Sequence, residues 1–239
     1  MRVLVTRPEP EASRTAEELA RRGHDAVIAP LLLVDPLVVP ASAAIPAGAI
    51  AALAVTSPRT AGLIAPENRT AWAHLPVFSV GDRTAAAMSG AGFRDVRSAA
   101  GDIRALGRLI VEAGLAPGTC ILSLGGEERA GDLAGLVAAA GLNVVEQALY
   151  RMTPVIALPA PLIDALAATD PLAALHYSPR SAATFAQLVA TAGLGAGAGH
   201  LTHLCLSEAV AGPLRGSGHA AIRVAARPDE AALLALLGH

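Results

Sequence analysis

The sequence contains no lysine, and all 18 of its basic residues are arginine. A GC-rich genome would produce this bias without any function. Whatever its origin, the absence excludes a lysine Schiff base and a lysine general base, and with them one class of covalent catalysis. Aromatic residues are also scarce, at 3% against 53% hydrophobic residues, so the cores must be built from Ala, Leu, Val and Ile.

Long apolar runs and cysteines are few as well. No stretch reaches the roughly 20 apolar residues that span a bilayer, and the start, MRVLVTRPEP, has too short an apolar run for a secretory signal. Cys120 and Cys205 are the only cysteines, and their apolar surroundings favour buried free thiols over a disulfide or a metal site. The formal net charge of −2 argues against nucleic acid as the main partner. We therefore expect a cytoplasmic protein.

The chain repeats itself. LAVTSPRT at residues 53–60 and ALHYSPRS at 174–181 both place an apolar run before Ser-Pro-Arg. Residues 3–32 align without a gap with 121–150, and residues 78–100 match 204–226. The sequence therefore predicts an ancient duplication, with two similar α/β bodies in 239 residues.

Each copy predicts strands that alternate with helices. The expected strands are 3–6, 26–33, 53–56, 77–80 and 95–98, and then 120–124, 143–150, 174–177, 203–206 and 221–225. The expected helices are 9–22, one from 60, one from 83, and 103–113, and then 132–140, 182–192, 209–215 and 229–237. Short apolar strands without polar alternation are typical of a parallel sheet covered on both faces. We expect two doubly wound, flavodoxin-like α/β domains.

Two proline-rich stretches, 34–47 and 151–161, separate these units and predict extended linkers. Two ways of folding remain open on this evidence. The first strand–helix–strand unit either joins the strands that follow it, or joins the last ones around an inserted domain.

Polar or glycine-rich residues follow six of the expected strands, at the edge where open α/β sheets bind ligands. Several of these junctions open onto helix N-termini, which attract carboxylate or phosphate. The expected anion-binding residues are Arg7, Ser57, Arg59, Gly81, Gly125, Arg129, Ser178, Arg180 and Ser207. The sequence thus favours a polyanionic small molecule as ligand. The alternative for each junction is an ordinary helix cap.

Other motifs give weaker signals. GLGAGAG at 193–199 precedes an expected strand instead of following one, which favours a loop over a dinucleotide site. His200 and His203 lack the accompanying ligands of a metal site, and His176 within a strand is expected to be a packed or edge histidine instead of a base. Tyr150 differs, because its counterpart in the first copy is Leu32. A phenol at the mouth of the sheet can donate or accept a hydrogen bond, although it could also serve only to cover the edge.

The ordered set VLVTRPEPEA, VTSPRTA, SVGDRTAAAMSGAGF, LSLGGEERAGDLAGLVAAAG ending in ALYRMTP, and HYSPRSAATF resembles uroporphyrinogen-III synthase along essentially the whole chain. The resemblance implies the inserted arrangement, with one domain of 1–34 plus 154–239 and a middle domain of 36–150. It also implies two antiparallel linker strands, at about 34–40 and 151–158, and an active-site cleft between the domains.

The resemblance implies a chemistry as well. Such an enzyme converts hydroxymethylbilane, a linear tetrapyrrole with eight carboxylates, into uroporphyrinogen III, losing water and inverting the last pyrrole without a cofactor. Tyr150 matches the tyrosine favoured to assist loss of the hydroxyl, and Thr84 matches a substrate-binding hydroxyl in a Gly-x-x-Thr loop. Ser57 and Ser178 match Ser-Pro positions.

The second copy of the Gly-x-x-Thr loop departs from that pattern. It reads Ser-Glu-Ala-Val at 207–210, and Glu208 would repel substrate carboxylates if it faced them. The middle domain is therefore expected to carry more of the chemistry. The rival interpretations are a cytosolic two-lobed anion-binding regulator and a glycosyl- or phosphoryl-transferase, the latter disfavoured because no nucleotide loop is present. A monomer is expected.

Overall fold

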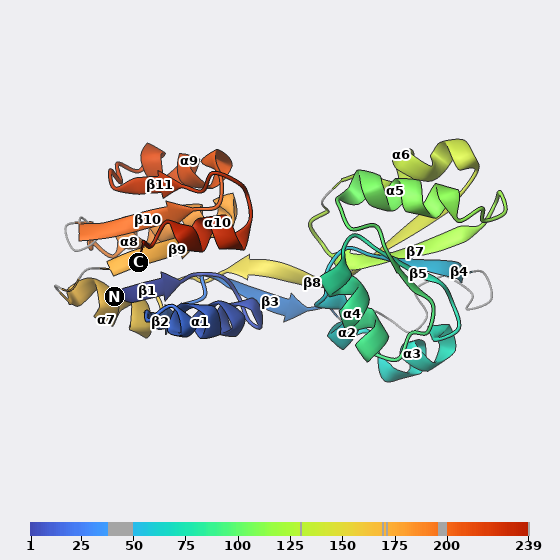
Figure 1. The fold of residues 1–239 in the computed structure, drawn as a ribbon, viewed down its shortest axis with the longest axis horizontal. Helices are drawn as coiled ribbons and strands as arrows, with labels where there is room; N and C mark the ends of the chain where they lie inside the picture. The colour runs from blue at the N-terminus through green and yellow to red at the C-terminus, as the bar shows by residue number, and fades with distance from the viewer. Residues whose placement is uncertain (38–49, 130, 169, 171, 196–199, 239) are drawn as a thin grey trace. The chain divides into compact units, whose positions relative to one another are not determined.

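The computed structural model describes residues 1–37, 50–129, 131–168, 170, 172–195 and 200–238. The chain divides into two compact units (Figure 1). Unit 1 contains Met1–Val34 and Thr153–His239, and unit 2 contains Asp35–Met152. No described helix is long and apolar enough to cross a membrane.

Unit 1 is a parallel sheet of five strands in the order β11-β10-β9-β1-β2. The strands are β1 (Arg2–Val5), β2 (Asp25–Ile28), β9 (Leu172–His176), β10 (Leu201–Cys205) and β11 (Ile222–Val224). The helices are α1 (Glu11–Arg21), α7 (Ala160–Ala167), α8 (Pro179–Thr191), α9 (Glu208–Gly216) and α10 (Glu230–Ala235). Because β1 pairs with β9, the two ends of the chain build one sheet.

Two apolar layers enclose this sheet. Helices α7, α8 and α9 pack on one face through residues such as Leu162, Phe185 and Leu214. Helices α1 and α10 pack on the other face through Leu19 and Leu233. This double coverage explains why the central strands β1 and β9 are nearly continuous apolar runs instead of alternating.

Unit 2 is a six-stranded sheet in the order β3-β8-β7-β4-β5-β6. The strands are β3 (Leu32–Pro36), β4 (Ile50–Val55), β5 (Val77–Ser79), β6 (Val96–Ser98), β7 (Cys120–Gly126) and β8 (Asn143–Pro154). The helices are α2 (Thr60–Leu63), α3 (Pro66–Trp72), α4 (Asp82–Gly90), α5 (Ile103–Glu112) and α6 (Leu133–Val137), which continues as a 3-10 turn, Ala138–Ala140. Strands β4 to β8 are parallel, and α5 and α6 share a core with them through Leu106 and Val137. The expected doubly wound α/β fold is confirmed.

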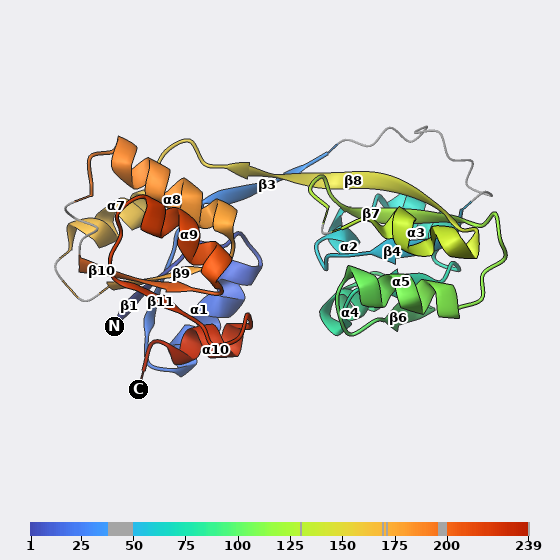
Figure 2. The same ribbon diagram turned by 90° about the horizontal axis from the view of Figure 1, so that it is seen from above.

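The chain crosses between the units within β3 and within β8, which lie side by side (Figure 2). The Leu37 N–H donates to the Leu149 carbonyl at 2.8 Å, and the Val155 N–H donates to the Leu31 carbonyl at 3.1 Å. Residue numbers rise along one strand as they fall along the other, so this pair is antiparallel. Within the expected linkers, residues 38–47 lie outside the described residues.

The copies differ where one strand was expected at 26–33. The structure has two strands there, β2 and β3, separated at Ala29–Leu31. Pro30 lies in this break, and it has no N–H to donate to a ladder. The second copy lacks that proline and continues as the single 12-residue strand β8.

The sequence interpretation also missed two helices. Helix α7 begins inside the stretch expected to be an extended linker, and α3 was not separated from α2. Both carry proline in the first turn, at Pro161 and Pro66. The N–H groups of a first turn have no partner within the helix, so proline loses no hydrogen bond there. Proline can therefore mark the start of a helix as well as its interruption.

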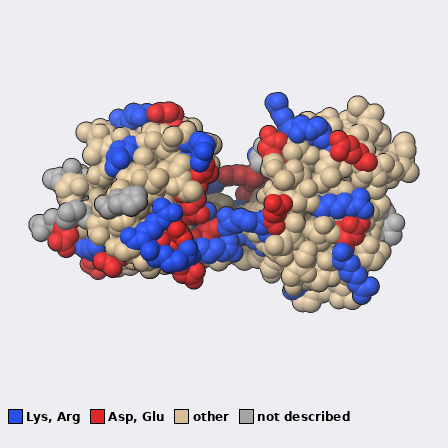
Figure 3. All heavy atoms as spheres, viewed as in Figure 1, with Lys and Arg blue, Asp and Glu red and all other residues tan. Residues whose placement is uncertain are grey.

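Arginine and acidic side chains lie side by side on the visible face of each unit (Figure 3). The structure also contains the ion pairs Arg22–Glu18 in unit 1 and Arg97–Asp95 in unit 2, both at 2.8 Å.

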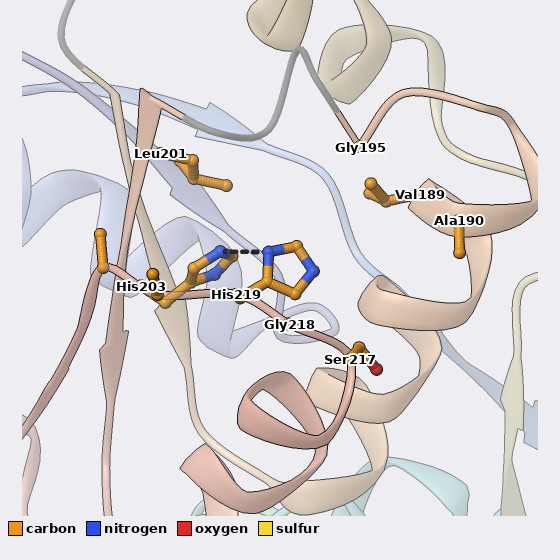
Figure 4. Close-up of a pocket in the computed structure, with 10 residues that line it drawn as sticks. Val189, Ala190, Gly195, Leu201, His203, Ser217, Gly218 and His219 are labelled. Carbon is orange, nitrogen blue, oxygen red and sulfur yellow. Dashed lines mark hydrogen bonds between the residues drawn. The ribbon is translucent and has the colours of Figure 1, made fainter.

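Three histidines form a hydrogen-bonded chain inside unit 1. His176 Nε2 lies 3.0 Å from His203 Nδ1, and His203 Nε2 lies 3.1 Å from His219 Nδ1 (Figure 4). The expectation that His176 is a packed histidine is confirmed, since it is fully buried. Burial lowers the pKa of His176 well below its usual value, lowers that of His203 to about 3 and lowers that of His219. All three histidines are therefore uncharged at neutral pH.

The direction of these bonds follows from the outer nitrogen of His176. Within the described residues, His176 Nδ1 is buried without a hydrogen-bond partner. A buried N–H without an acceptor is rarer than a buried acceptor without a donor. His176 therefore carries its proton on Nε2 and donates to His203, which in turn donates to His219. The Nε2–H of His219 is left to donate into a cavity of about 210 Å³ lined by Val189, Leu201 and Ser217, among others.

We predict that acid destabilises unit 1. The unfolded His203 side chain binds a proton below about pH 6.5, whereas burial keeps the folded one neutral down to about pH 3, so stability falls across this window by at most about 1.4 kcal/mol per pH unit. The lowered pKa values of His176 and His219 act in the same direction. Urea unfolding followed by far-UV circular dichroism at several pH values measures this slope. The single tryptophan, Trp72, lies in unit 2, so its fluorescence follows the other unit in the same sample.

Replacing His203 tests the origin of the slope. His203→Gln should flatten the pH dependence, whereas His200→Gln, at an exposed position, should keep it. Equal slopes in the two variants would contradict the assignment.

Candidate functional site

The predicted site residues of unit 2 lie along one edge of its sheet. Strands β8, β7, β4 and β5 are consecutive neighbours and run in the same direction, so their carboxyl ends share this edge. Tyr150 lies on β8, Gly125 on β7, Ser57 after β4 and Gly81 after β5. Neighbouring strands are about 4.8 Å apart, so Tyr150 and Gly81 are separated by three spacings, about 14 Å. A ligand that reaches both must be long.

Tyr150 packs against the end of β7. A shift in register after Gly125 places Gly126 opposite Tyr150. A Cβ atom on Gly126 would lie 3.0 Å from Cε2 and Cζ of the ring, so any larger residue there requires the ring to shift. The ring is 7% exposed. Within the described residues the phenol oxygen has no hydrogen-bond partner, so it is available to a ligand.

Thr84 lies in the first turn of α4, which begins without a side-chain cap. The preceding Gly81 is extended, with φ −159° and ψ 168°, and its carbonyl accepts the Thr84 N–H at 3.0 Å. Thr84 itself is only 3% exposed. The first N–H groups of α4 are thus left for an external acceptor, which suits a carboxylate.

The second copy repeats this backbone. Ser207 precedes α9 with φ −159° and ψ 169°, and its side chain does not cap the helix either. Val210 takes the place of Thr84 and is buried. In contrast, Asp102, Ser178 and Asp229 cap the N-termini of α5, α8 and α10 with their own side chains. The two copies therefore share an uncapped N-terminus, but only the first has a hydroxyl beside it.

The remaining predicted residues of unit 2 lie between Tyr150 and Thr84. The Ser57 hydroxyl accepts the Arg59 N–H at 3.3 Å, so Ser57 forms part of the turn. Arg129 pairs with Glu146 at 3.4 Å, and its guanidinium lies beside the position of a Cβ on Gly125.

In unit 1 the structure assigns a cap role to one predicted site residue. The Ser178 hydroxyl accepts the Ser181 N–H at 3.1 Å, as the helix-cap alternative requires. Arg180 follows it within α8 and is partly buried. Arg7 pairs with Glu230 at 2.9 Å and stacks over the ring of Tyr177, 4.0 Å from its centre. Sequence reasoning missed Tyr177 and Glu230.

Glu208 does not present an isolated charge. It pairs with Arg215 of the same helix, whose hydrogen bond lowers the pKa of the Glu208 carboxyl. The neighbouring guanidinium offsets the repulsion that Glu208 alone would exert on a carboxylate.

Among the described residues no group of three His, Cys, Asp or Glu side chains has the arrangement of a metal site. The GLGAGAG stretch at 193–199 lies partly outside the described residues. The predicted active-site cleft stays a prediction.

The sequence matches the profile of the protein family described as uroporphyrinogen-III synthase HemD over residues 13–235. No curated protein matches it. Uroporphyrinogen-III synthetase from Helicobacter pylori has a similar structure, with 15% identity and a TM-score of 0.65 over 99% of this chain and 98% of that one. A variant of uroporphyrinogen III synthase from Thermus thermophilus has 18% identity and a TM-score of 0.52 over 100% of this chain and 96% of that one. At these identities the two structures establish a shared fold.

The contact between Gly126 and Tyr150 yields a prediction. Gly126→Ala should push the Tyr150 ring out of its place and cost about 1–3 kcal/mol of stability, as overpacking does. With ¹³C-labelled tyrosine, the two tyrosines give two sets of ring signals, and we expect only that of Tyr150 to move.

Gly62→Ala is the matched control. Nothing lies within 4 Å of a Cβ on Gly62, so that substitution should leave both tyrosine signals in place. An unmoved Tyr150 signal in Gly126→Ala would show that the contact does not position the ring.

Proposed function

The chain belongs to the uroporphyrinogen-III synthase family, whose reaction is the cyclisation of hydroxymethylbilane, and we propose that Tyr150 assists the loss of water in that reaction. The chain is thus a lyase of tetrapyrrole biosynthesis, the route to porphyrins and haem. Hydroxymethylbilane loses its terminal hydroxyl and closes to uroporphyrinogen III, with inversion of the last pyrrole.

The step assigned to Tyr150 is departure of the hydroxyl. A hydrogen bond from the phenol to the leaving oxygen stabilises the charge that develops there, and the oxygen takes a proton from solvent and departs as water. A cationic azafulvene remains. The last pyrrole attacks its methylene carbon through the α-carbon that already carries the bridge to the third pyrrole. The bond from that α-carbon to the bridging methylene then breaks, and the methylene cation so formed is captured by the other α-carbon of the same ring, which releases a proton. The ring is thereby inverted. Phenols are weak acids at neutral pH, so the role of Tyr150 is to donate a hydrogen bond in the transition state.

One observation carries this assignment. Tyr150 packs on Gly126 with its phenol oxygen unpartnered within the described chain, at the sheet edge that also bears the uncapped N-terminus of α4. One end of a long substrate then reacts at Tyr150 while carboxylates farther along it bind the α4 N–H groups and Thr84. Arg59 and Arg129 lie between them and supply positive charge.

We propose that both units contribute to substrate binding. The uncapped N-terminus of α9, after Ser207, and Arg7 and Arg180 are the groups of unit 1 that suit carboxylates. Binding across two units holds the reacting ends together, which lowers the entropic part of the barrier.

We further propose a monomer that acts in the cytoplasm on this small molecule, with no nucleic acid partner and no cofactor. Cys120 and Cys205 are free thiols, and burial raises the pKa of Cys205 to about 12, which keeps it unreactive. Such thiols suit a reducing compartment.

The experiment that tests the function is incubation of the purified chain with freshly prepared hydroxymethylbilane. Resolving the isomers should give uroporphyrinogen III, whereas spontaneous closure gives type I. Binding of the substrate with type I product alone would favour the alternative of a two-lobed anion-binding regulator.

Tyr150→Phe should lower kcat for type III formation and leave KM close to the wild-type value, because the hydroxyl acts in the transition state. The ring remains to fill its site, so the melting temperature should change little. Unchanged turnover would remove Tyr150 from the mechanism.

Thr84→Val should raise KM severalfold with a smaller effect on kcat, because it deletes one hydroxyl and keeps the shape of the side chain. Thr60→Val is the matched control: Thr60 is also buried in the first turn of a helix, and its hydroxyl has no partner in the described chain. Equal KM values for the two variants would exclude a binding role for Thr84.

A further inference from the structure

Three hydrogen-bond donors in unit 1 converge on a single oxygen of Glu230. Oε1 of this carboxylate accepts from Arg7 Nη1 at 2.9 Å, from Thr15 Oγ1 at 2.7 Å and from Tyr177 Oη at 2.9 Å. The donors come from the end of β1, from α1 and from the end of β9, and Glu230 is the first residue of α10. Charge-assisted bonds of this kind are what a carboxylate oxygen needs when water is removed.

The donors are held in place without help from Glu230. The Arg7 guanidinium stacks on the Tyr177 ring, 4.0 Å from its centre. Arg7 also donates to the Thr15 hydroxyl at 3.3 Å, so the proton of Thr15 is directed toward Glu230. Thr15 is buried, and burial raises the pKa of Tyr177 well above its usual value, so its hydroxyl stays a donor at any working pH.

The Glu230 side chain is less buried than the Arg7 side chain that binds it. The Arg7 side chain is 18% exposed and that of Glu230 is 39% exposed, so the oxygen position can be reached from water once Glu230 turns away. Helix α10 stays anchored by Leu233 and Leu234, which are buried in the apolar core. A change in the Glu230 side chain alone would therefore vacate the position.

The position of this cluster in the fold distinguishes it from an ordinary surface ion pair. Arg7 and Tyr177 follow β1 and β9, two adjacent parallel strands, and so lie at the carboxyl edge where open α/β sheets bind ligands. The comparable pair in unit 1, Glu208 with Arg215, also lies at the start of a helix, but the Glu208 side chain is 70% exposed and Arg215 is its one partner among the described residues.

We propose that Arg7, Thr15 and Tyr177 form a carboxylate-binding site that Glu230 fills as an internal ligand, and that a carboxylate of the substrate displaces Glu230 there. The second half rests on the proposed function, since the substrate of that reaction carries eight carboxylates. One carboxylate replaces another, so the exchange leaves the number of charges in the site unchanged. Glu230 then acts as a competitor that weakens substrate binding.

The first test does not involve catalysis. Glu230→Ala vacates the site, so acetate should raise the melting temperature of this variant in a saturable way at pH 7.5 and constant ionic strength. Chloride at the same concentration is the blank. Glu208→Ala is the matched control, because its lost carboxylate had a single arginine as partner, and acetate should leave it unchanged. Adding Tyr177→Phe to Glu230→Ala should weaken the acetate effect.

Either of two results overturns the site: acetate that stabilises neither variant, or acetate that stabilises Glu208→Ala and Glu230→Ala equally. If Glu230→Ala does not fold, Glu230→Gln replaces it. The amide keeps the shape of the side chain but not the charge, so acetate should compete with it and stabilise the variant more than it stabilises wild type. Equal stabilisation overturns the site.

The second test concerns the substrate. Glu230→Gln should lower KM for hydroxymethylbilane severalfold with kcat little changed, because the internal ligand is weaker. A purely structural role for the cluster would instead lower stability and leave KM unchanged, and an unchanged or raised KM overturns the displacement step. If wild type made no uroporphyrinogen III, the proposed function would fail while the acetate result still stood.

Discussion

The first N–H groups of a helix have no partner within the helix, and this constraint governs both sheet edges of the chain. A side chain supplies the acceptor at α5, α6, α8 and α10, as Asp102 does for α5 and Asp229 for α10. At α4 and α9 no side chain does, and both helices begin with the same extended backbone at Gly81 and Ser207. Both copies keep these N–H groups without a side-chain acceptor, as expected if a bound anion accepts their hydrogen bonds.

The two copies keep this shared feature while their side chains diverge. The first copy retains a hydroxyl at Thr84 where the second has the apolar Val210, and the second places Tyr150 where the first has Leu32. Both polar groups belong to unit 2. Unit 1 has instead the cluster of Arg7, Thr15, Tyr177 and Glu230, so the two units offer different interactions to the carboxylates of a substrate.

Local patterns in the sequence were sufficient for the strand–helix order, and the inserted arrangement of the domains was implied only by the family resemblance. The apolar runs predicted the strands, and Ser-Pro-Arg marked two junctions. Helices α3 and α7 were not predicted, because the prolines in their first turns were interpreted as signs of loops or linkers. The Arg7–Glu230 contact joins residues 223 positions apart, and no local signal announces it. Tyr177 could have been noticed, as one of two tyrosines and the neighbour of a Ser-Pro-Arg.

The pairing of β1 with β9 has a consequence for synthesis of the chain. Leu172 lies 170 residues beyond Arg2, its partner in the sheet. At about 5–20 residues per second, a ribosome needs roughly 10–30 s to supply that partner strand. The apolar Val3, Leu4 and Val5 emerge first yet are covered on one side only by β2 until then. Unit 2 is contiguous and can complete its sheet in the meantime. The strands of the inserted body are therefore all synthesised before the sheet that holds the amino terminus can be completed.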